Sequence, residues 1–479
     1  MDDNRDDLVL DIRPEDEEDE NLMNSQVPLT PNTDENLHPK NHFKDRRSFA
    51  LSVFNLMNAI LGSGILGLGE AAKNLGLVMF VVLLTATALL AAYTINMLLH
   101  ATEMTKEKTY EGLAKATFGL RAKVLVSILI VFHCFGAICS YIYIVKNELP
   151  EVLKALTDYK EIEGQASPFY LNGDFLVILI VVCIVLPLAC MKDIRFLGYS
   201  SALGLTCMLL FVFTVVLKKF EIPCPLPIFN RDQYLTNTLD NSSFPDEDFE
   251  EQTCEAKAFF LSTRSAYAVP TMFFSFMCHA SMVPIYAELR RPSIKKMQKI
   301  ACISIFNVYT LYLLAAIFGY TTFYNKTLSE LLLTYSFYKS RDVLIILSRM
   351  MVIVCVTLSI PLLHYVGRKT IIITFFRKSN SFSWTKHIGV MIGLLTVAVV
   401  LVMFIPNIRD IFGMSGASTS TPLLVIIPSA FFIKLTGKDA KLHIQSKFAT
   451  RRKVAWFLAV LGTALMLFSM ALIIWDWAA

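Results

Sequence analysis

Charged side chains are scarce in this sequence of 479 residues, and they are unevenly spread. Asp, Glu, Lys and Arg make up 18% of the chain, whereas an ordinary soluble domain contains about 25%. Residues 1–47 alone hold 14 acids and 6 bases, so the rest is poorer still and consists of long apolar runs between short charged clusters. This pattern excludes a soluble multidomain protein and indicates an integral membrane protein.

Several other signals are absent. A collagenous or coiled-coil class has no support, and ten cysteines in a chain of this length are too few for a disulfide scaffold. The sequence contains no metal-ligand spacing, nucleophile elbow or phosphate loop with a lysine, so we expect neither an enzyme nor a cofactor. Residues 1–47 also lack the basic start and apolar stretch of a cleavable signal peptide. The net charge of +4 reflects membrane topology, and we expect no nucleic-acid partner.

Eleven apolar runs are long enough to cross a bilayer core, which needs about 20 residues per helix. The predicted spans are 48–71, 76–100, 122–146, 172–191, 195–217, 265–288, 298–322, 342–366, 387–406, 409–433 and 453–475. With the N-terminus in the cytoplasm, the inside segments carry 28 Lys and Arg and the outside segments 13. Because basic residues beside spans stay in the cytoplasm, we expect a cytoplasmic N-terminus and an extracellular C-terminus.

The predicted fold class is therefore an all-α integral membrane protein with eleven transmembrane helices. Residues 1–47 form a disordered acidic cytoplasmic tail, because they are polar and without periodicity. Five-helix units follow at 48–217 and 265–433, separated by an extracellular loop at 218–264, and the eleventh helix is 453–475. Since five is odd, consecutive five-helix units must have opposite orientations in the bilayer, as in transporters built from inverted repeats.

The acidic tail contains one short motif. Glu18 precedes Leu22 and Met23 at the spacing of an acidic dileucine-like sorting signal. The tail is thus a candidate for binding a cytoplasmic sorting or signalling partner. The alternative is an ordinary solvated run of charge.

The predicted 218–264 loop carries two cysteines, Cys224 and Cys254, on the oxidising side of the membrane, where they are well placed to form a disulfide. Closing a loop near 30 residues long stabilises the fold by roughly 3–4 kcal/mol in the chain-entropy treatment. Asn241 in this loop, and Asn325 in another outside loop, match the acceptor pattern for N-glycosylation. We therefore expect a disulfide-bonded glycoprotein.

The first span carries a Gly-Ser-Gly sequence at Gly62, Ser63 and Gly64. Together with Gly67 it spells a dinucleotide fingerprint, but the strand, helix and acidic residue that such a site needs are missing. Glycine weakens a helix and permits unusual backbone torsions, so this stretch predicts an unwound point that lines a cavity. The alternative is close helix packing through small residues.

The sixth span is interrupted by prolines. Pro270 and Pro284 bracket the stretch from Phe273 to Ser281 and the polar residues within it, and each proline removes one helical hydrogen bond. Interrupted helices at the head of each of two inverted units are the best sequence indication of a transporter binding site.

Three blocks carry a family resemblance: Phe54–Gly69, Pro270–Glu288 and Gly416–Thr421. They resemble the sodium-coupled neutral amino acid transporters, the system A and system N group of the amino acid/auxin permease superfamily. The resemblance covers nearly the whole membrane region. It implies a LeuT-type fold, in which an inverted five-plus-five core is followed by one extra C-terminal helix.

The resemblance also implies a substrate site. The carboxylate and amine of the amino acid would bind at Gly62, Ser63 and Gly64, because helix N-termini bind anions. Three residues would wall the side-chain pocket: Phe274, Ser275 and Phe276. For Phe276, simple helix packing is the alternative.

Sodium is implied as the coupling ion. Asn58 and Thr357 match the family's sodium-linked asparagine and threonine, and Ser359 is a nearby candidate. Thr357 could instead bond to its own helix. Likewise, Ser418–Thr421 either line the pathway or satisfy backbone groups around Pro422.

Ionisable residues within the predicted spans are functional candidates. His279, beside the sixth-span break, either binds substrate or a proton or is a hydrogen-bonded structural residue, and His133 has weaker support. Glu70 is either solvated at the outer mouth or biases cation coupling. We expect Arg349, near the start of its span, to snorkel outward.

The sequence thus predicts a secondary active transporter of the plasma membrane that moves small neutral amino acids, of the glutamine and alanine class, with sodium by alternating access. Two alternatives stay open. One is a proton-coupled amino acid carrier of an endosomal or lysosomal membrane, with coupling at Glu70, His279 or His133. The other is an amino-acid sensor with little transport, whose acidic tail binds a signalling partner.

Overall fold

The computed structural model describes residues 49–157, 168–190, 198–226, 253–337, 342–375, 384–437, 440 and 442–478. Regular secondary structure in these ranges is helical throughout. Ten helices are long and apolar enough to cross a membrane, and a bent helix pair supplies an eleventh span. For the described part of the chain, this confirms the predicted all-α protein with eleven transmembrane helices. Residues 1–47 and Asn241 lie outside these ranges.

The first five spans are α2 (Phe49–Ile60) with α3 (Gly64–Leu75), α4 (Leu77–Thr105), α6 (Leu120–Thr157), α7 (Gly173–Ile180) with η3 (Val181–Val185) and α8 (Leu186–Cys190), and α9 (Gly198–Glu221). The next six are α11 (Ala268–Ser275) with α12 (His279–Glu288), α13 (Ile294–Phe323), α15 (Val343–Phe375), α16 (Trp384–Phe404), α17 (Ile408–Ser415) with η10 (Gly416–Ser420), η11 (Pro422–Ile426) and α18 (Ile427–Leu435), and α20 (Ala449–Ala478). Short helices connect them: α5 (Tyr110–Phe118), η7 (Thr263–Tyr267), α14 (Leu331–Thr334), η9 (Tyr335–Phe337) and α19 (Leu442–Lys447).

The outward faces of the bundle are strongly apolar. Large hydrophobic side chains are more than half exposed on several different spans: Leu89, Phe132, Phe306, Phe404 and Trp456. In water such a surface would be an aggregation hazard, whereas in a bilayer it contacts lipid. The multi-pass membrane protein expected from the sequence is thus reflected in the surface as well as in helix length.

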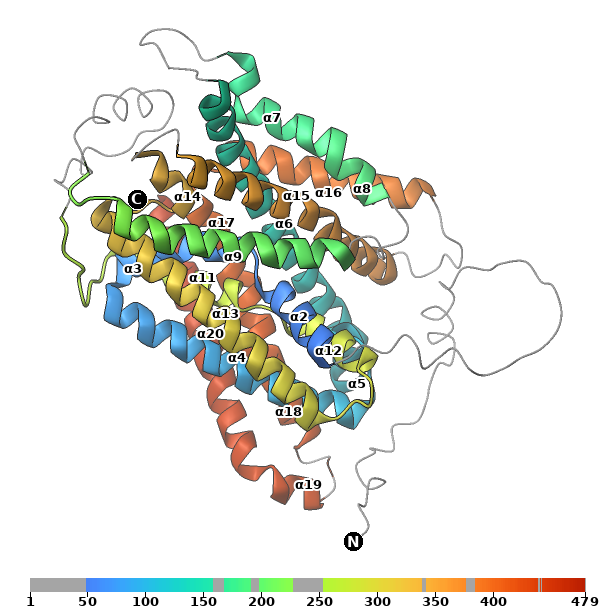
Figure 1. Cartoon of the computed structure of the whole chain (residues 1–479). Helices are drawn as coiled ribbons and strands as arrows, with labels where there is room; N and C mark the ends of the chain where they lie inside the picture. The colour runs from blue at the N-terminus through green and yellow to red at the C-terminus, as the bar shows by residue number, and fades with distance from the viewer. Residues whose placement is uncertain are drawn as a thin grey trace.

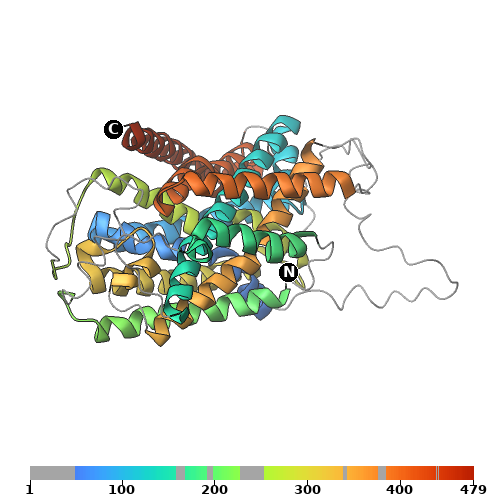
Figure 2. The ribbon, with the colours of Figure 1, turned by 90° about the horizontal axis from the view of Figure 1, so that it is seen from above.

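Helix interruptions lie at the centre of the bundle. The chain bends by 58° between α2 and α3, and α11 and α12 are separated by Phe276–Cys278. In Figure 1, α2 runs beside α12 and α3 beside α11, and both pairs are in contact. The C-terminal helix α20 packs on α18 and lies at the edge of the molecule in Figure 2 (dark red).

The predicted disulfide is present and joins Cys224 to Cys254. The chain that follows it pairs with the turn between α3 and α4: the Leu77 amide donates to the Lys257 carbonyl oxygen at 2.8 Å. Gly76 in this turn has φ of +77°, and an added Cβ would lie 2.7 Å from the Ala258 carbonyl oxygen. Only glycine suits both constraints. The disulfide therefore fastens the end of α9 to the C-terminal end of α3.

Candidate functional site

The two broken spans are joined by one buried tyrosine. The Tyr312 hydroxyl of α13 lies 2.9 Å from the Ile60 carbonyl oxygen at the end of α2 and 3.0 Å from the Ser275 carbonyl oxygen at the end of α11. Both carbonyls belong to last helical turns, which lack intrahelical donors. Tyr312 is fully buried. The two interruptions therefore meet at a common point, as the sequence predicted for a binding site.

The Gly-Ser-Gly stretch is tightly enclosed. A Cβ on Gly64 would lie 2.2 Å from the Ser275 Oγ, and one on Gly62 would lie 2.9 Å from the Tyr141 hydroxyl. The Ser63 and Ser140 hydroxyls are 2.6 Å apart. The predicted break in the helix is therefore present, and the small residues also permit close approach to α6 and α11, whereas a cavity at this point stays a prediction.

The start of α3 exposes backbone donors to this region. Ser63 occupies the N-cap position without a side-chain capping bond, so the first amides of α3 have no side-chain partner there. Such amides and the positive end of the helix dipole attract a carboxylate. The ends of α2 and α11 present carbonyl oxygens, which attract an ammonium group. Donors and acceptors for the backbone of an amino acid thus lie side by side.

Aromatic rings surround the break in α11. The Phe274 ring centroid is 5.2 Å from that of Phe412 and 5.4 Å from that of His133, which is consistent with the predicted pocket wall. Phe276 packs edge-on against Tyr312 at 5.3 Å and is fully buried. For Phe276 this favours the packing alternative.

Asn58 and one face of α15 meet at Gly204 of α9. A Cβ on Gly204 would lie 3.3 Å from the Asn58 side-chain oxygen and 3.3 Å from the Cys355 sulfur. Ser359, one turn after Cys355, shares that face, and its hydroxyl donates to the Cys355 carbonyl oxygen at 2.8 Å. Thr357 lies about 200° around the helix from Cys355. Asn58 and Ser359 therefore approach one interface, whereas Thr357 faces elsewhere and stays a prediction.

The Thr357 hydroxyl is buried and has no hydrogen-bond partner among the described residues. The structure therefore does not show the alternative in which the Thr357 hydroxyl bonds to its own helix. A buried hydroxyl without a partner carries an energetic penalty unless something binds it. This orphaned oxygen is a hard oxygen ligand of the kind that sodium requires, as is the amide oxygen of Asn58 at the separate Gly204 interface.

The histidines occupy hydrogen-bonded positions. His279 at the start of α12 is fully buried, and its Nε2 is 2.9 Å from the Thr94 hydroxyl of α4, an arrangement that favours a structural role. His133 Nδ1 is 3.2 Å from the Ser420 hydroxyl. Neither contact reaches the Gly-Ser-Gly stretch.

Hydroxyls in the π-helical part of the tenth span mostly satisfy backbone carbonyls. Ser418 donates to Met414 at 2.6 Å, Thr419 to Ser415 at 2.6 Å and Thr421 to Gly416 at 2.9 Å. This supports the second of the two predicted roles. The bonds compensate for the irregular ladder that Pro422 imposes.

Glu70 is not solvated, contrary to one expectation. It is 8% exposed and pairs with Arg409 of α17 at 3.3 Å. The Arg409 guanidinium also lies over the Tyr267 ring at 4.8 Å and 3.9 Å from Asp476 near the end of α20. An ion-pair cluster therefore connects α3, η7, α17 and α20. The sequence concealed it, because its members lie in four separate segments.

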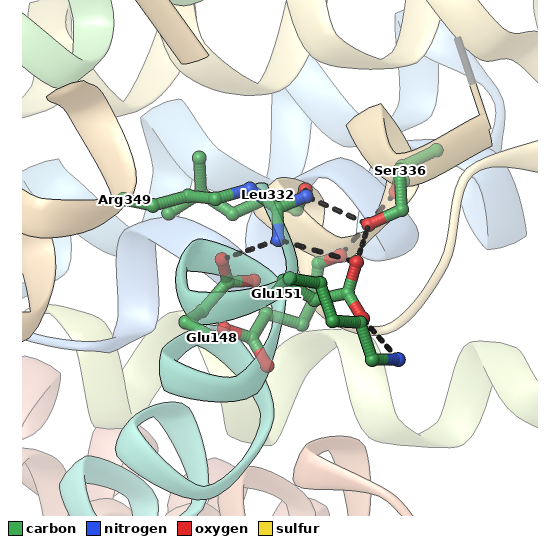
Figure 3. A network of polar contacts seen from close by, with 8 residues as sticks. Glu148, Glu151, Leu332, Ser336 and Arg349 are labelled. Carbon is green, nitrogen blue, oxygen red and sulfur yellow. Dashed lines mark hydrogen bonds and ion pairs between the residues drawn. The ribbon is translucent and has the colours of Figure 1, made fainter. Parts of the chain in front are cut away.

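Arg349 does not snorkel outward, so that expectation is wrong. It is 4% exposed and turns inward to Glu148 of α6, with 3.1 Å between Nη1 and Oε2. Figure 3 shows the guanidinium held between Glu148, Glu151 and Ser336. A buried acidic partner on a neighbouring helix explains the inward orientation better than access to the membrane surface.

Several residues of the site escaped sequence reasoning. Tyr312, Tyr141, Ser140 and Gly204 lie inside unbroken apolar spans, where a single tyrosine, serine or glycine is ordinary. Their importance follows only from which helices are neighbours. A sequence pattern carries no signal for that contact.

Two facing helix breaks inside an eleven-span helical bundle define a secondary transporter of the LeuT-type fold. Among solved structures, the chain is similar to the inward-facing conformation of Mhp1, with a TM-score of 0.51 and 14% identity, covering 92% of this chain and 94% of that one. This likeness shows the fold, and it confirms the architecture that the sequence resemblance implied.

Residues 45–475 match the family described as transmembrane amino acid transporter protein. The chain is 41% identical to sodium-coupled neutral amino acid symporter 2 of Danio rerio over 432 residues, which cover 90% of this chain and 82% of that protein. It is 38% identical to sodium-coupled neutral amino acid transporter 4 of Homo sapiens over 479 residues, covering 91% and 86%. The chain belongs to the transmembrane amino acid transporter family, and the expectation of a transporter rather than an enzyme is confirmed.

Proposed function

We propose that the chain is a sodium-coupled symporter of small neutral amino acids that works by alternating access. The observation that carries this proposal is the meeting of the α2–α3 and α11–α12 breaks at Tyr312. It supplies oppositely polarised helix ends within reach of one small zwitterion. The names of the two relatives support sodium and neutral amino acids as the transported species.

In this proposal the substrate carboxylate binds the first amides of α3 at Ser63 and Gly64, and the ammonium group binds the carbonyl ends of α2 and α11. The side chain then extends towards Phe274, Phe412 and His133, whose rings are in contact. These rings carry no net negative charge and favour a neutral side chain. The tight contact between Gly64 and Ser275 keeps the site small.

Sodium would bind through oxygen atoms between α2 and α15. Asn58 supplies an amide oxygen and Ser359 a hydroxyl from the α15 face at Gly204, and the partnerless Thr357 hydroxyl is a further candidate. Binding at α2 would hold the first half of the broken span in place. Sodium would thereby pre-organise the substrate site and couple the two binding events.

We further propose residence in the plasma membrane, with the N-terminus cytoplasmic and the C-terminus extracellular. The excess of Lys and Arg in the segments on one side supports this orientation. The disulfide joins the end of α9 to the chain that pairs with the turn after α3, and the proposed topology puts this end on the oxidising outer face. The proposal also includes five-helix units at 48–217 and 265–433. It further includes glycosylation at Asn241 and Asn325 and a partner that binds the N-terminal tail.

Reconstituted full-length protein tests the function. Uptake of glutamine and alanine into liposomes is measured with a sodium gradient, with a proton gradient and with neither. We expect accumulation only with the sodium gradient. Accumulation with the proton gradient alone would identify a proton-coupled carrier. Substrate binding without accumulation under any gradient would identify a sensor.

A further inference from the structure

A second group of buried ionisable residues lies away from the substrate site, where α6 ends and α15 begins. Glu148 on α6 and Glu330 just before α14 are both fully buried. Arg349 of α15 pairs with Glu148 at 3.1 Å (Figure 3). None of these residues contacts the Gly-Ser-Gly stretch or Asn58 within the described part of the chain. The proposed transport mechanism therefore assigns no role to this group of residues.

The neighbouring charges do not balance. Three carboxyl groups, those of Glu148, Glu151 and Glu330, face two bases, Lys154 and Arg349. The Glu151 carboxylate has its own polar partners, since it pairs with Lys154 at 3.1 Å and accepts a hydrogen bond from Ser336 at 3.2 Å. Arg349 alone is therefore left to neutralise both Glu148 and Glu330.

Arg349 is also engaged elsewhere. Its Nη2 donates to the Leu332 carbonyl oxygen at 3.0 Å and to the Ser336 hydroxyl at 2.7 Å. Within the described residues, neither oxygen of Glu330 accepts a hydrogen bond, and neither does either oxygen of Glu148. An ionised carboxylate that is fully buried without hydrogen bonds is strongly disfavoured and takes up a proton instead.

The surroundings of Glu330 also favour its protonated form. Burial raises the pKa of Glu330 well above its ordinary value, the Glu148 carboxyl raises it further, and Arg349 offsets only part of this. From α6, Asn147 and Tyr143 also face Glu330. Lys73, the one cation of α3, donates to the Thr327 carbonyl oxygen at 3.1 Å.

We propose that Glu148 and Glu330 together bind one proton, and that this proton-binding site fastens the segment 327–334 to α6. Protonation lets one carboxyl donate to the other, so that a single negative charge remains and Arg349 balances it. When the proton leaves to water, two carboxylates face each other around one guanidinium. Two neighbouring carboxylates that interact directly repel strongly in a buried setting.

The position of the site gives the proton a mechanical consequence. Leu331, next to Glu330, packs on α3 and α13: its Cδ1 would lie 3.4 Å from a Cβ on Gly69 and 2.7 Å from one on Gly319. The proton therefore links α6 and α15 to a segment that rests on the half-helix beyond the substrate site. Loss of the proton would loosen this segment.

Infrared difference spectroscopy of the purified full-length protein tests the site without relying on transport. The readout is the carbonyl stretch of a protonated carboxylic acid at neutral pH. We expect Glu330→Gln and Glu148→Gln each to abolish one such band, because removing either acid leaves Arg349 only one of these two carboxylates to balance. The matched control Glu151→Gln, one turn along α6, should retain the band.

A band that persists unchanged in both Glu330→Gln and Glu148→Gln would overturn the proposal. If either variant fails to fold, the wild-type protein still decides, by titration from neutral to alkaline pH. Loss of one protonated carboxyl band on alkalinisation is expected. A wild-type spectrum without a protonated carboxyl band at neutral pH would refute the site, whatever the transport assays show.

Discussion

At the scale of single residues, the centre of the molecule depends on the absence of side chains. Gly64 approaches Ser275 so closely that a methyl group would overlap the serine hydroxyl. Ser275 is buried and bonded to the Thr271 carbonyl oxygen of its own helix at 2.8 Å, so it has little freedom to withdraw. The contact therefore fixes the spacing between the two broken spans.

Gly64→Ala is expected to reduce sodium-driven uptake at least about tenfold while the protein still reaches the membrane. The added methyl overpacks the α3–α11 contact, a change that typically costs about 1–3 kcal/mol. Initial uptake rates normalised to surface protein measure the effect. Gly389→Ala is the matched control, because nothing lies within 4 Å of its added Cβ. Equal rates in the two variants would show that the contact is dispensable.

Asn58→Ala should raise the sodium concentration for half-maximal uptake about tenfold, equivalent to about 1.4 kcal/mol of binding free energy. Ser359→Ala should raise it as well, because it removes an oxygen ligand, and Thr357→Val tests whether a hydroxyl on another face of α15 also contributes. Thr310→Ala, on the exposed side of α13, serves as control. Thr357→Val is especially informative, since the Thr357 hydroxyl has no hydrogen-bond partner among the described residues and its removal leaves none of them unsatisfied. Unchanged sodium dependence in Asn58→Ala would refute the ion site.

At the scale of helices and their contacts, two ion-pair clusters hold the ends of the broken spans. Glu70 and Arg409 connect α3 to α17, whereas Glu330 and Glu148 connect the α14 segment to α6. In the first cluster Arg409 pairs with three acids, Glu70, Asp410 and Asp476, while Lys73 and Arg264 lie near Glu70 alone. The stability of this cluster therefore depends far more on Arg409 than on any one acid.

Arg409→Gln is expected to destabilise the purified protein by about 3 kcal/mol, because it leaves partly buried acids without a cation. Glu70→Gln should cost clearly less, since Arg409 keeps Asp410 and Asp476 within 3.9 Å. Thermal unfolding midpoints in detergent measure both changes. Equal midpoints for the two variants would contradict this asymmetry.

The Glu330 site makes stability depend on pH. A carboxyl with a raised pKa keeps its proton in the folded state at pH values where the unfolded chain has released it, so stability falls as pH rises through that interval. The slope is about 1.4 kcal/mol per pH unit for one proton. Unfolding midpoints of the wild type should fall with rising pH, and Glu330→Gln should flatten the decline. A Glu330→Gln profile parallel to the wild type would exclude a role for this carboxyl.

The sequence predicted where the spans lie better than where they end. All eleven runs became helices, because bilayer thickness sets a length that apolar runs reveal. The third run was predicted to end at residue 146, before Glu148 and Glu151. Instead α6 continues to Thr157 through both acids and through Pro150. Burial of the acids against Arg349 and Glu330 makes this possible, and those partners lie far along the chain.

At the scale of the whole molecule, the candidate site was predicted in outline. The glycines and prolines mark the two breaks, because backbone irregularity has a residue-level signal. Tyr312, Gly204 and Arg409 could not be found in this way, since they act through contacts between distant segments. For the same reason, the sequence could not predict that Asn58 and Thr357 lie at different interfaces. That difference depends on how α15 is turned about its own axis.

The disulfide contributes to stability of the entire fold. Cys224 and Cys254 are separated by 30 positions, and closing a loop of that size contributes roughly 3–4 kcal/mol by restricting the unfolded chain. Cys224→Ser should lower the thermal unfolding midpoint accordingly, and added reductant should have no further effect on that variant. The control is Cys183→Ser, which removes an exposed free thiol. A midpoint unaffected by Cys224→Ser would contradict the expected stabilisation.

Tyr312 has one proton to donate and two carbonyls within reach, one at the end of each broken span. If the two halves of the molecule move apart, the hydroxyl keeps whichever carbonyl stays near it. Separation of the two broken spans thus costs the Tyr312 hydroxyl one of its two possible acceptors. The hydroxyl is still not left as an unsatisfied buried donor. We expect that redundancy to lower the energy barrier for opening the centre of this protein, and a phenylalanine at the same position would lack it.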